Sequence, residues 1–471
     1  MSTEKAGAQR APVFRNALDV CKDDGLKARP VRAQELCCAL LSGRGEASGE
    51  ALACELIRVY QTMKPAQRVA FFEMLARDFA PDPRRVSQAA KDYFEKPCHE
   101  TFFKLWSTVE PPRQELFRRI NVAPGGTQAL IDLRADLINL LSQRPHLAEV
   151  DFDLKHLFAS WFNRGFLRLE RIDWRTPAEI LEKLIRYEAV HEINGWTDLR
   201  RRLAEDRRCF AFFHPALPGE PLIFVEVALT RGVARTLQPL LDPEAPILPS
   251  EQADTAIFYS ISNCLAGLRG ISFGSFLIKQ VMAELKAELR GVRHYLTLSP
   301  LPGFAAALRE RADPHGFTHR RLLRLLSDYA SQIRHRTGMR NVVEGFDRLL
   351  ADPLANKRVL AAPLARLALA YLTQVKRDGQ IADPVASFHL ANGARLERIN
   401  PFANTKLYGL QSSFGLMVNY RYVSSELEQN HEAFVTEGVI ALSPWLEREY
   451  RKIAMMWGGD ENLSSLARVK L

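Results

Sequence analysis

The sequence predicts an α+β protein in two parts: an all-helical part over residues 1–172 and a mixed α/β part over residues 173–471 that contains a helical insertion. Three observations support this prediction. Apolar residues recur at helical spacing through the first part, runs rich in β-branched and aromatic residues begin after Trp174, and helical spacing returns between residues 318 and 376. A chain of 471 residues is long enough for two or three domains.

The first part reads as successive amphipathic helices. Residues 51–60 repeat apolar side chains at spacings of three and four. Pro65 begins another helix, Thr127 begins a further one, and residues 153–173 form the last. We find no chemistry in these helices and expect a bundle with a scaffold or oligomerisation role.

The second part begins with Thr176, a plausible N-cap, and Pro177 at the first helical position. Strands are then expected, because runs of apolar, β-branched and aromatic residues alternate with turns. These runs cover residues 209–213, 222–229, 256–262 and 293–298. An amphipathic helix over residues 275–290 lies between the last two strands, and a helical insertion follows at residues 318–376.

Composition narrows the class of protein. Hydrophobic residues make up 47% and charged residues 25%, as in an ordinary globular protein. No apolar run approaches the roughly 20 residues of a membrane-spanning helix, and residues 1–16 lack the apolar core of a secretory signal, so a cytoplasmic protein without membrane contact is expected. The seven cysteines form no Cys-x-x-Cys pair and have no histidines at zinc spacing, so no metal site is expected.

The net charge of +9 allows three interpretations. The basic residues are dispersed and often adjoin acidic ones, which favours a solvated surface over nucleic-acid binding. A small ligand carrying several phosphates would also favour a positive field. No recognised nucleic-acid-binding module or basic stripe is present.

A strand, a glycine-rich turn and a helix succeed one another over residues 257–290. A strand that leads through Gly270 and Gly274 into a helix leaves backbone N–H groups able to bind a pyrophosphate. Neither a P-loop nor the dinucleotide fingerprint is present, and the glycines are equally compatible with a simple tight turn.

Two further stretches carry chemistry. Ser299 ends a predicted strand and precedes a proline-stiffened turn, which places its hydroxyl near a ligand or, alternatively, in a turn or cap. His389 lies on a short apolar segment, followed by Asn392-Gly393 and by a tyrosine-rich, strand-like run to Tyr422. A lone histidine there is more often structural, but amides, small hydroxyls and glycine around it indicate the wall of a polar pocket.

Several short motifs in this order resemble the malonyl-CoA decarboxylase family. The motifs are Trp-Arg-Thr-Pro-Ala at 174–178, Pro-Gly-Glu-Pro-Leu at 218–222, Phe-Tyr-Ser-Ile-Ser at 258–262, Leu-Ser-Pro-x-Pro-Gly-Phe at 298–304, Phe-His-Leu-x-Asn-Gly-Ala at 388–394 and Gly-Leu-Met-x-Asn-Tyr-Arg-Tyr at 415–422. The resemblance implies a helical N-terminal domain for oligomer contacts and a second domain of GNAT acetyltransferase-like fold. It also implies conversion of malonyl-CoA to acetyl-CoA and carbon dioxide by a homotetramer that uses no metal or organic cofactor.

The resemblance also assigns residues. Ser299 and His389 correspond to the family's serine–histidine pair. Residues expected to bind the substrate are Ser260, Arg269, Gly270, Ser272, Gly274, Ser275, Asn392 and Tyr422, with the turn from Arg269 to Gly274 holding the CoA pyrophosphate. Ser272 stands where relatives have a glutamate, so the group that orients His389 is left open.

The expected chemistry is stabilisation and protonation of a thioester enolate. His389 protonates the α-carbon or polarises the thioester oxygen, while Ser299 hydrogen-bonds the departing carboxylate or relays the proton. Two other functions remain open at this point. One is a GNAT-type acyltransferase that moves an acyl group from CoA to an amine, and the other is a non-catalytic interaction protein that binds acyl-CoA.

Overall fold

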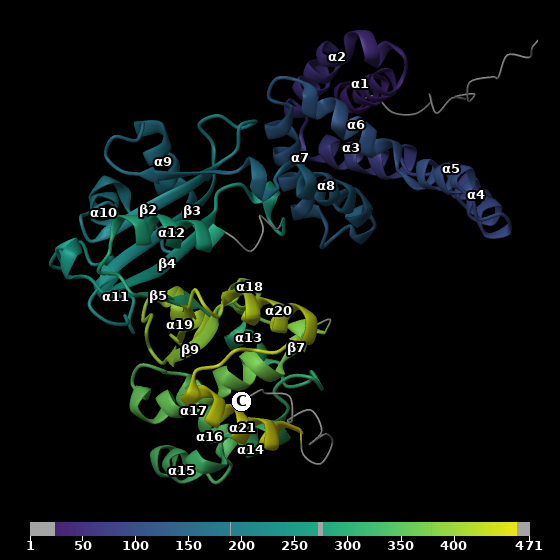
Figure 1. The fold of residues 1–471 in the computed structure, drawn as a ribbon. Helices are drawn as coiled ribbons and strands as arrows, with labels where there is room; N and C mark the ends of the chain where they lie inside the picture. The colour runs from purple at the N-terminus through teal and green to yellow at the C-terminus, as the bar shows by residue number, and fades with distance from the viewer. Residues whose placement is uncertain (1–23, 189, 272–276, 378, 459–471) are drawn as a thin grey trace, which may run out of the picture. The chain divides into compact units, whose positions relative to one another are not determined.

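The structure, a computed structural model, describes residues 24–188, 190–271, 277–377 and 379–458. Its contacts divide the chain into two compact units, Met1–His156 and Leu157–Leu471. The predicted fold class is confirmed: the first unit is helical, and the second combines a mixed sheet with helices (Figure 1). None of the described helices is long and apolar enough to cross a membrane.

The first unit is a bundle whose helices pack through aromatic and leucine side chains. Its helices are α1 (Asp24–Leu41), α2 (Arg44–Gln61), α3 (Pro65–Asp78), α4 (Pro83–Glu95), α5 (His99–Val109), α6 (Pro112–Val122), α7 (Gly126–Leu140) and the start of α8 (Ala148–Trp161). Phe71, Phe72 and Phe117 are fully buried. The helices α4 and α5 pack on each other as a hairpin, which Figure 1 shows as an extended arm of this unit.

The second unit is built on one large sheet in the order β1-β2-β3-β4-β5-β10-β6, with β9 paired to β10. Its strands are β1 (Arg168–Ile172), β2 (Arg207–Phe213), β3 (Pro221–Thr230), β4 (Thr255–Asn263), β5 (His294–Thr297), β6 (Ser299–Pro300), β9 (Arg395–Asn400) and β10 (Met417–Tyr422). Every pairing is antiparallel except that of β4 with β5. A right-handed crossover through a helix is the usual way to join two parallel neighbours, and α12 (Leu277–Glu288) lies in that connection.

Helices surround the sheet. They are α9 (Ala178–Tyr187), α10 (Gly195–Arg202), α11 (Gln238–Leu241), α13 (Phe304–Arg309), α14 (His319–Leu325), α15 (Ala330–Thr337), α16 (Val342–Leu350), α17 (Lys357–Gln374), α18 (Pro384–Ala391), α19 (Leu407–Ser413), α20 (Leu427–Glu437) and α21 (Pro444–Gly458). The stretch α14–α17 is the predicted helical insertion. A small hairpin, β7 (Lys376–Arg377) with β8 (Gln380–Ile381), follows it.

Three elements differ from the expectation. Residues 168–172 form the edge strand β1 rather than the end of a helix, so the predicted division after residue 172 separates this strand from its sheet. Residues 395–400 form β9, which was not predicted. Both strands mix charged and apolar residues at a sheet edge, which obscures the alternation that marks a strand. His389, expected on an apolar segment too short for a buried helix, lies on the helix α18.

Gly393 ends α18 in a left-handed conformation, with a φ of +79°. A Cβ at this position would lie 2.1 Å from the carbonyl oxygen of Leu427, where α20 begins. Only glycine therefore allows α20 to pack this closely against the end of α18. Figure 1 shows α18 and α20 side by side.

We expect Gly393→Ala to lower the free energy of unfolding of the second unit by about 2 kcal/mol or more, because a methyl group adds a backbone clash to the strain of a positive φ. Gly338→Ala is the matched control, since Gly338 has a φ of +70° but open space around it. The control should cost only about 1 kcal/mol. Chemical denaturation measures both, and equal losses would contradict the role of the Leu427 contact.

Candidate active site

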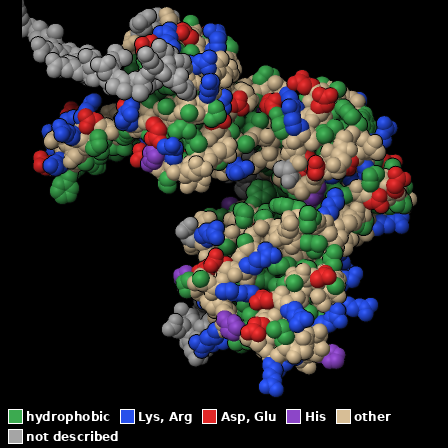
Figure 2. All heavy atoms as spheres, turned by 180° about the vertical axis from the view of Figure 1, so that it is seen from behind, with side chains coloured by type: hydrophobic (Ala, Val, Ile, Leu, Met, Phe, Trp, Pro, Cys, Tyr) green, Lys and Arg blue, Asp and Glu red, His purple; other side chains and the backbone are tan. Residues whose placement is uncertain are grey.

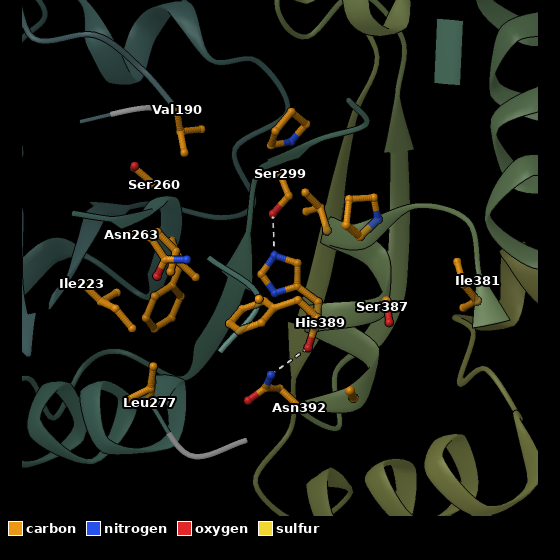
Figure 3. Close-up of a pocket in the computed structure, with 18 of the residues that line it drawn as sticks. Val190, Ile223, Ser260, Asn263, Leu277, Ser299, Ile381, Ser387, His389 and Asn392 are labelled. Carbon is orange, nitrogen blue, oxygen red and sulfur yellow. Dashed lines mark hydrogen bonds between the residues drawn. The ribbon is translucent and has the colours of Figure 1, made fainter. Parts of the chain in front are cut away.

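A cavity of about 1170 Å³ opens where β4 and β5 part. The parallel pairing runs as far as Phe258 and Thr297, and the N–H of Leu298 still donates to the carbonyl of Phe258 at 2.9 Å. Beyond this point β4 stays paired with β3, whereas Ser299 in β6 stays with β10, which already pairs with β5. Figure 3 shows Ser260 and Ser299 on the separate strands that border this cavity.

Ser299 is held in place by Thr297 and by strand β10. Its hydroxyl donates to Oγ1 of Thr297 at 3.0 Å, and that oxygen also accepts the N–H of Tyr420 at 3.1 Å. Asn419 donates from Nδ2 to the Thr297 carbonyl at 2.7 Å. Strand β10 therefore holds both Thr297 and Ser299 in place.

His389 is carried by α18, an eight-residue helix that depends on its cap. Asp383 accepts the N–H groups of Val385 and Ala386 at 3.0 and 2.9 Å, and Pro384 occupies the first helical position. The Asp383 carboxyl is fully buried, and burial raises its pKa to about 6 against the opposing effect of these N–H groups and that of Gly303. Gly303 belongs to the turn that follows Ser299, so one carboxyl group contacts both segments of the site.

The structure brings Ser299 and His389 together, as predicted. The Ser299 hydroxyl oxygen lies 2.9 Å from Nε2 of His389, although 90 residues separate them (Figure 3). Tyr422 lies on the opposite side of the imidazole, with its hydroxyl 2.8 Å from Nδ1. The ring of Tyr420 stacks on the imidazole with centroids 4.7 Å apart and an interplanar angle of 27°. The imidazole is thereby held on three sides.

Burial decides the charge of this histidine. His389 is 3% exposed, and burial lowers its pKa to about 3, so the ring is neutral at pH 7. Burial also raises the pKa of Tyr422 well above its usual value, so that hydroxyl keeps its proton. Since Ser299 donates to Thr297, the imidazole must donate from Nε2–H to Ser299 and accept at Nδ1 from Tyr422.

Tyr422 therefore occupies the orienting position that the sequence left open. A hydroxyl that donates to Nδ1 selects the Nε2–H tautomer, just as a carboxylate would select the opposite one. The resemblance implied that Tyr422 binds the substrate, whereas its hydroxyl is bonded to His389 and Tyr422 is not among the residues that line the cavity. The tyrosine-rich run that ends β10 was the signal for this residue.

Ser260 contacts a buried carboxylate that sequence reasoning missed. Glu188, at the end of α9, accepts the Ser260 hydroxyl at 2.7 and 2.8 Å and the Ser262 hydroxyl at 3.0 Å. It also accepts the N–H groups of Val190 and His191 at 2.9 and 2.8 Å. No sequence signal linked Glu188 to the pocket, because more than seventy positions separate it from the two serines.

The remaining predicted residues divide into three groups. Asn392 and Gly270 line the cavity. Arg269 is exposed beside Gly270, and its side chain is not part of the lining. Ser272, Gly274 and Ser275 lie outside the described residues, so the predicted pyrophosphate turn stays a prediction.

In the part of the chain that the structure describes, no group of three or more His, Cys, Asp or Glu side chains is arranged to hold a metal ion. The cysteines found there, Cys37, Cys38, Cys54, Cys98, Cys209 and Cys264, are all free.

The fold and the cavity define an α+β protein with a helical first part and a buried serine–histidine pair at a cavity of the second part. The family models for the malonyl-CoA decarboxylase N-terminal and C-terminal domains match residues 79–162 and 165–457. The chain therefore belongs to the malonyl-CoA decarboxylase family.

Individual relatives agree with this assignment. The crystal structure of malonyl-CoA decarboxylase from Rhodopseudomonas palustris is 46% identical, covers 89% of this chain and 99% of its own, and gives a TM-score of 0.79. The corresponding structure from Agrobacterium vitis is 44% identical, covers 88% and 99%, and gives 0.74. The mitochondrial malonyl-CoA decarboxylase of Anser anser anser is 34% identical over 413 residues, which are 82% of this chain and 80% of the relative.

The tautomer and charge of His389 can be tested directly. We expect ring ¹⁵N shifts of His389 to show neutral Nε2–H imidazole from pH 8 down to about pH 4.5, because its pKa lies near 3. Tyr422→Phe should broaden or shift these signals, since the donor to Nδ1 is lost. An imidazolium already present at pH 6 would contradict the assignment.

The lowered pKa of His389 also makes the folding stability depend on pH. An unfolded histidine binds a proton below about pH 6.5, whereas buried His389 binds one only near pH 3. The contribution of this residue is therefore complete above about pH 6.5 and decreases as the pH falls toward 3. Denaturation of the wild type and of His389→Asn from pH 7.5 to 4.5 should show a smaller loss of stability with acidification in the variant.

Proposed function

We propose that this chain converts malonyl-CoA to acetyl-CoA and carbon dioxide. The observation that carries the proposal is the Ser299–His389 pair, with its hydroxyl and Nε2 2.9 Å apart at the edge of a large cavity. Membership of the family supports the substrate, since the relatives bear the name malonyl-CoA decarboxylase.

The reaction breaks the bond between the α-carbon and the carboxylate carbon. The electron pair of that bond moves into the thioester to form an enolate, carbon dioxide leaves, and the α-carbon then takes up one proton. Charge develops on the thioester oxygen during the first step. A preorganised donor at that oxygen is typically worth about 3 kcal/mol of barrier.

His389 supplies such a donor. In the structure this Nε2–H donates to Ser299; when the thioester oxygen takes the place of the Ser299 hydroxyl, the neutral imidazole polarises that oxygen without carrying charge itself. This property favours polarisation of the oxygen over direct protonation by an imidazolium. Ser299, released from Nε2, can turn its hydroxyl from Thr297 to the carboxylate. After carbon dioxide leaves, the Ser299 hydroxyl gives its proton to the α-carbon and regains one from water.

The CoA moiety extends from this pair toward Gly270, where the turn after β4 borders the same cavity. Backbone N–H groups that precede a helix favour a pyrophosphate, so we place the CoA phosphates at this end of the cavity. The reaction as proposed needs no metal or organic cofactor, because the thioester itself delocalises the electron pair. Full activity after dialysis against EDTA would support this part, and restoration by an added metal would refute it.

Substitution of the pair tests the assignment. Purified protein should form acetyl-CoA and carbon dioxide from malonyl-CoA, and we expect Ser299→Ala and His389→Asn each to lower kcat by at least about a hundredfold. Ser327→Ala, which removes a serine hydroxyl bonded to the Arg324 carbonyl outside the cavity, should leave kcat unchanged.

Product analysis separates decarboxylation from the alternatives. An acyltransferase would release free CoA only when an amine acceptor is present. An acyl-CoA-binding interaction protein would bind malonyl-CoA without turnover. Unchanged turnover of malonyl-CoA in both Ser299→Ala and His389→Asn would contradict the assignment of these two residues.

A homotetramer in the cytoplasm is also part of the proposal. The hairpin of α4 and α5 exposes aromatic side chains, with Phe103 63% and Trp106 68% exposed, and a groove of about 1140 Å³ runs beside Trp106 and Phe152. Figure 2 shows hydrophobic side chains reaching the surface of this unit. Exposed apolar patches of this kind commonly bind other protein surfaces. Cell fractionation tests the location.

We expect light scattering after size exclusion to give the mass of a tetramer for the wild type. Trp106→Ser should shift this mass toward smaller species, because it removes apolar area from the patch. Lys91→Ser, on the same hairpin but outside the aromatic cluster, is the control that should remain tetrameric. A monomeric wild type would refute the tetramer.

A further inference from the structure

Asn392 presents an unsatisfied acceptor to the cavity. It is 5% exposed and lines the cavity that contains Ser299 and His389. Its Nδ2 donates to the carbonyl of Phe388 at 2.7 Å, which fixes the orientation of the amide. Within the described residues its Oδ1 is buried and accepts no hydrogen bond. In Figure 3 this oxygen points away from the helix toward the side of the cavity where Leu277 lies.

The backbone on both sides of Asn392 is held in place by α20. His431 bonds through Nδ1 to the carbonyl of Ala391 at 2.6 Å, and Asn430 donates to the carbonyl of Gly393 at 3.2 Å. The close approach of Gly393 to Leu427 adds a third restraint. Since neither the backbone nor the amide is free to turn, the acceptor is preorganised for a donor from a ligand.

A buried amide oxygen without a partner is destabilising, and such an oxygen can only accept a hydrogen bond. A ligand that satisfies it must therefore bring an N–H or O–H group. The part of a CoA thioester nearest the reacting carbonyl that carries such a donor is the amide of the cysteamine unit.

The distance from the thioester to the cysteamine amide matches the distance between His389 and Asn392. Only the sulfur and two methylene groups separate the thioester carbonyl carbon from the amide nitrogen. Asn392 follows His389 by three positions, and side chains three apart along a helical turn lie roughly 5–6 Å from each other. A thioester whose oxygen faces Nε2 of His389 thus places its amide N–H within reach of Asn392.

We propose that Oδ1 of Asn392 binds the cysteamine amide N–H of the substrate and so sets the position of the thioester against His389. This inference rests on the proposed function and adds to it a recognition element. It makes the acyl-cysteamine unit, rather than the nucleotide, the part of the substrate that aligns the reacting carbonyl.

The test pairs two truncated substrates. One is the malonyl thioester of N-acetylcysteamine, and the other is the same molecule with an ester oxygen in place of the amide N–H. We expect the wild type to prefer the amide by about tenfold or more in kcat/KM, because the ester leaves Oδ1 unpaired and facing a second acceptor. For a compound turned over too slowly, its inhibition constant against malonyl-CoA gives the same comparison.

Asn392→Ala should reduce this preference to about onefold. Asn356→Ala is the matched control, since Asn356 also donates from Nδ2 to the carbonyl four positions earlier, that of Asp352 at 2.9 Å, but lies outside the cavity. The control should keep the full preference. A general loss of stability in Asn392→Ala would lower turnover of both compounds equally and would not change their ratio.

Equal use of the two compounds by the wild type would overturn the proposal, and so would a preference that survives in Asn392→Ala. Failure of the wild type to decarboxylate malonyl-CoA is a different result, which would overturn the proposed function instead.

Discussion

The N–H of Leu298 donates the last hydrogen bond between the β5 segment and β4, to the carbonyl of Phe258. The site exists because the pairing of these two strands ends at this bond. Had the ladder continued, Ser260 and Ser299 would have been neighbours within a closed sheet. Because the chain after β5 instead stays with β10 and leaves β4, the two strands separate and a cavity lined by side chains from both remains between them. The carboxyl ends of parallel strands are a common place for ligands for the same reason.

The elements that border this opening are anchored by buried polar groups. Asp383 and Glu188 each accept several hydrogen bonds in places where a carboxylate is costly to bury. The raised pKa of Asp383, about 6, reflects that cost. Such groups do little for net stability, but each one joins segments that are distant in the sequence. Asp383 joins the start of α18 to the turn after Ser299, and Glu188 joins the end of α9 to β4.

The sequence predicts the parts of the fold whose pattern is local. Strands β2, β3 and β4 are almost wholly buried, and their aromatic and β-branched runs predicted them. The edge strands β1 and β9 were not predicted, because they are partly exposed and carry charged residues on both faces of the sheet. Helix α18 is too short for apolar periodicity to reveal it, although Asp383 and Pro384 form a helix start signal.

The candidate site shows the same division. Ser299 and His389 were found because each lies in a distinctive motif, and the structure supplies only their distance. Glu188 could not be found, because its importance comes entirely from where the sheet brings Ser260 and Ser262. The direction of a hydrogen bond, such as that between Tyr422 and Nδ1 of His389, likewise depends on burial and on neighbours that no short motif records.

A tyrosine in the orienting position suits the proposed chemistry better than a carboxylate would. A carboxylate at Nδ1 favours the imidazolium, whose charge would attract the malonyl carboxylate in the ground state as strongly as the enolate in the transition state. Binding both states equally does not lower the barrier. A neutral imidazole held by Tyr422 has a weaker attraction for the carboxylate, yet it offers a directed N–H to the oxygen where charge appears. The burial that lowers the pKa of His389 is thus a condition for its selectivity between the two states.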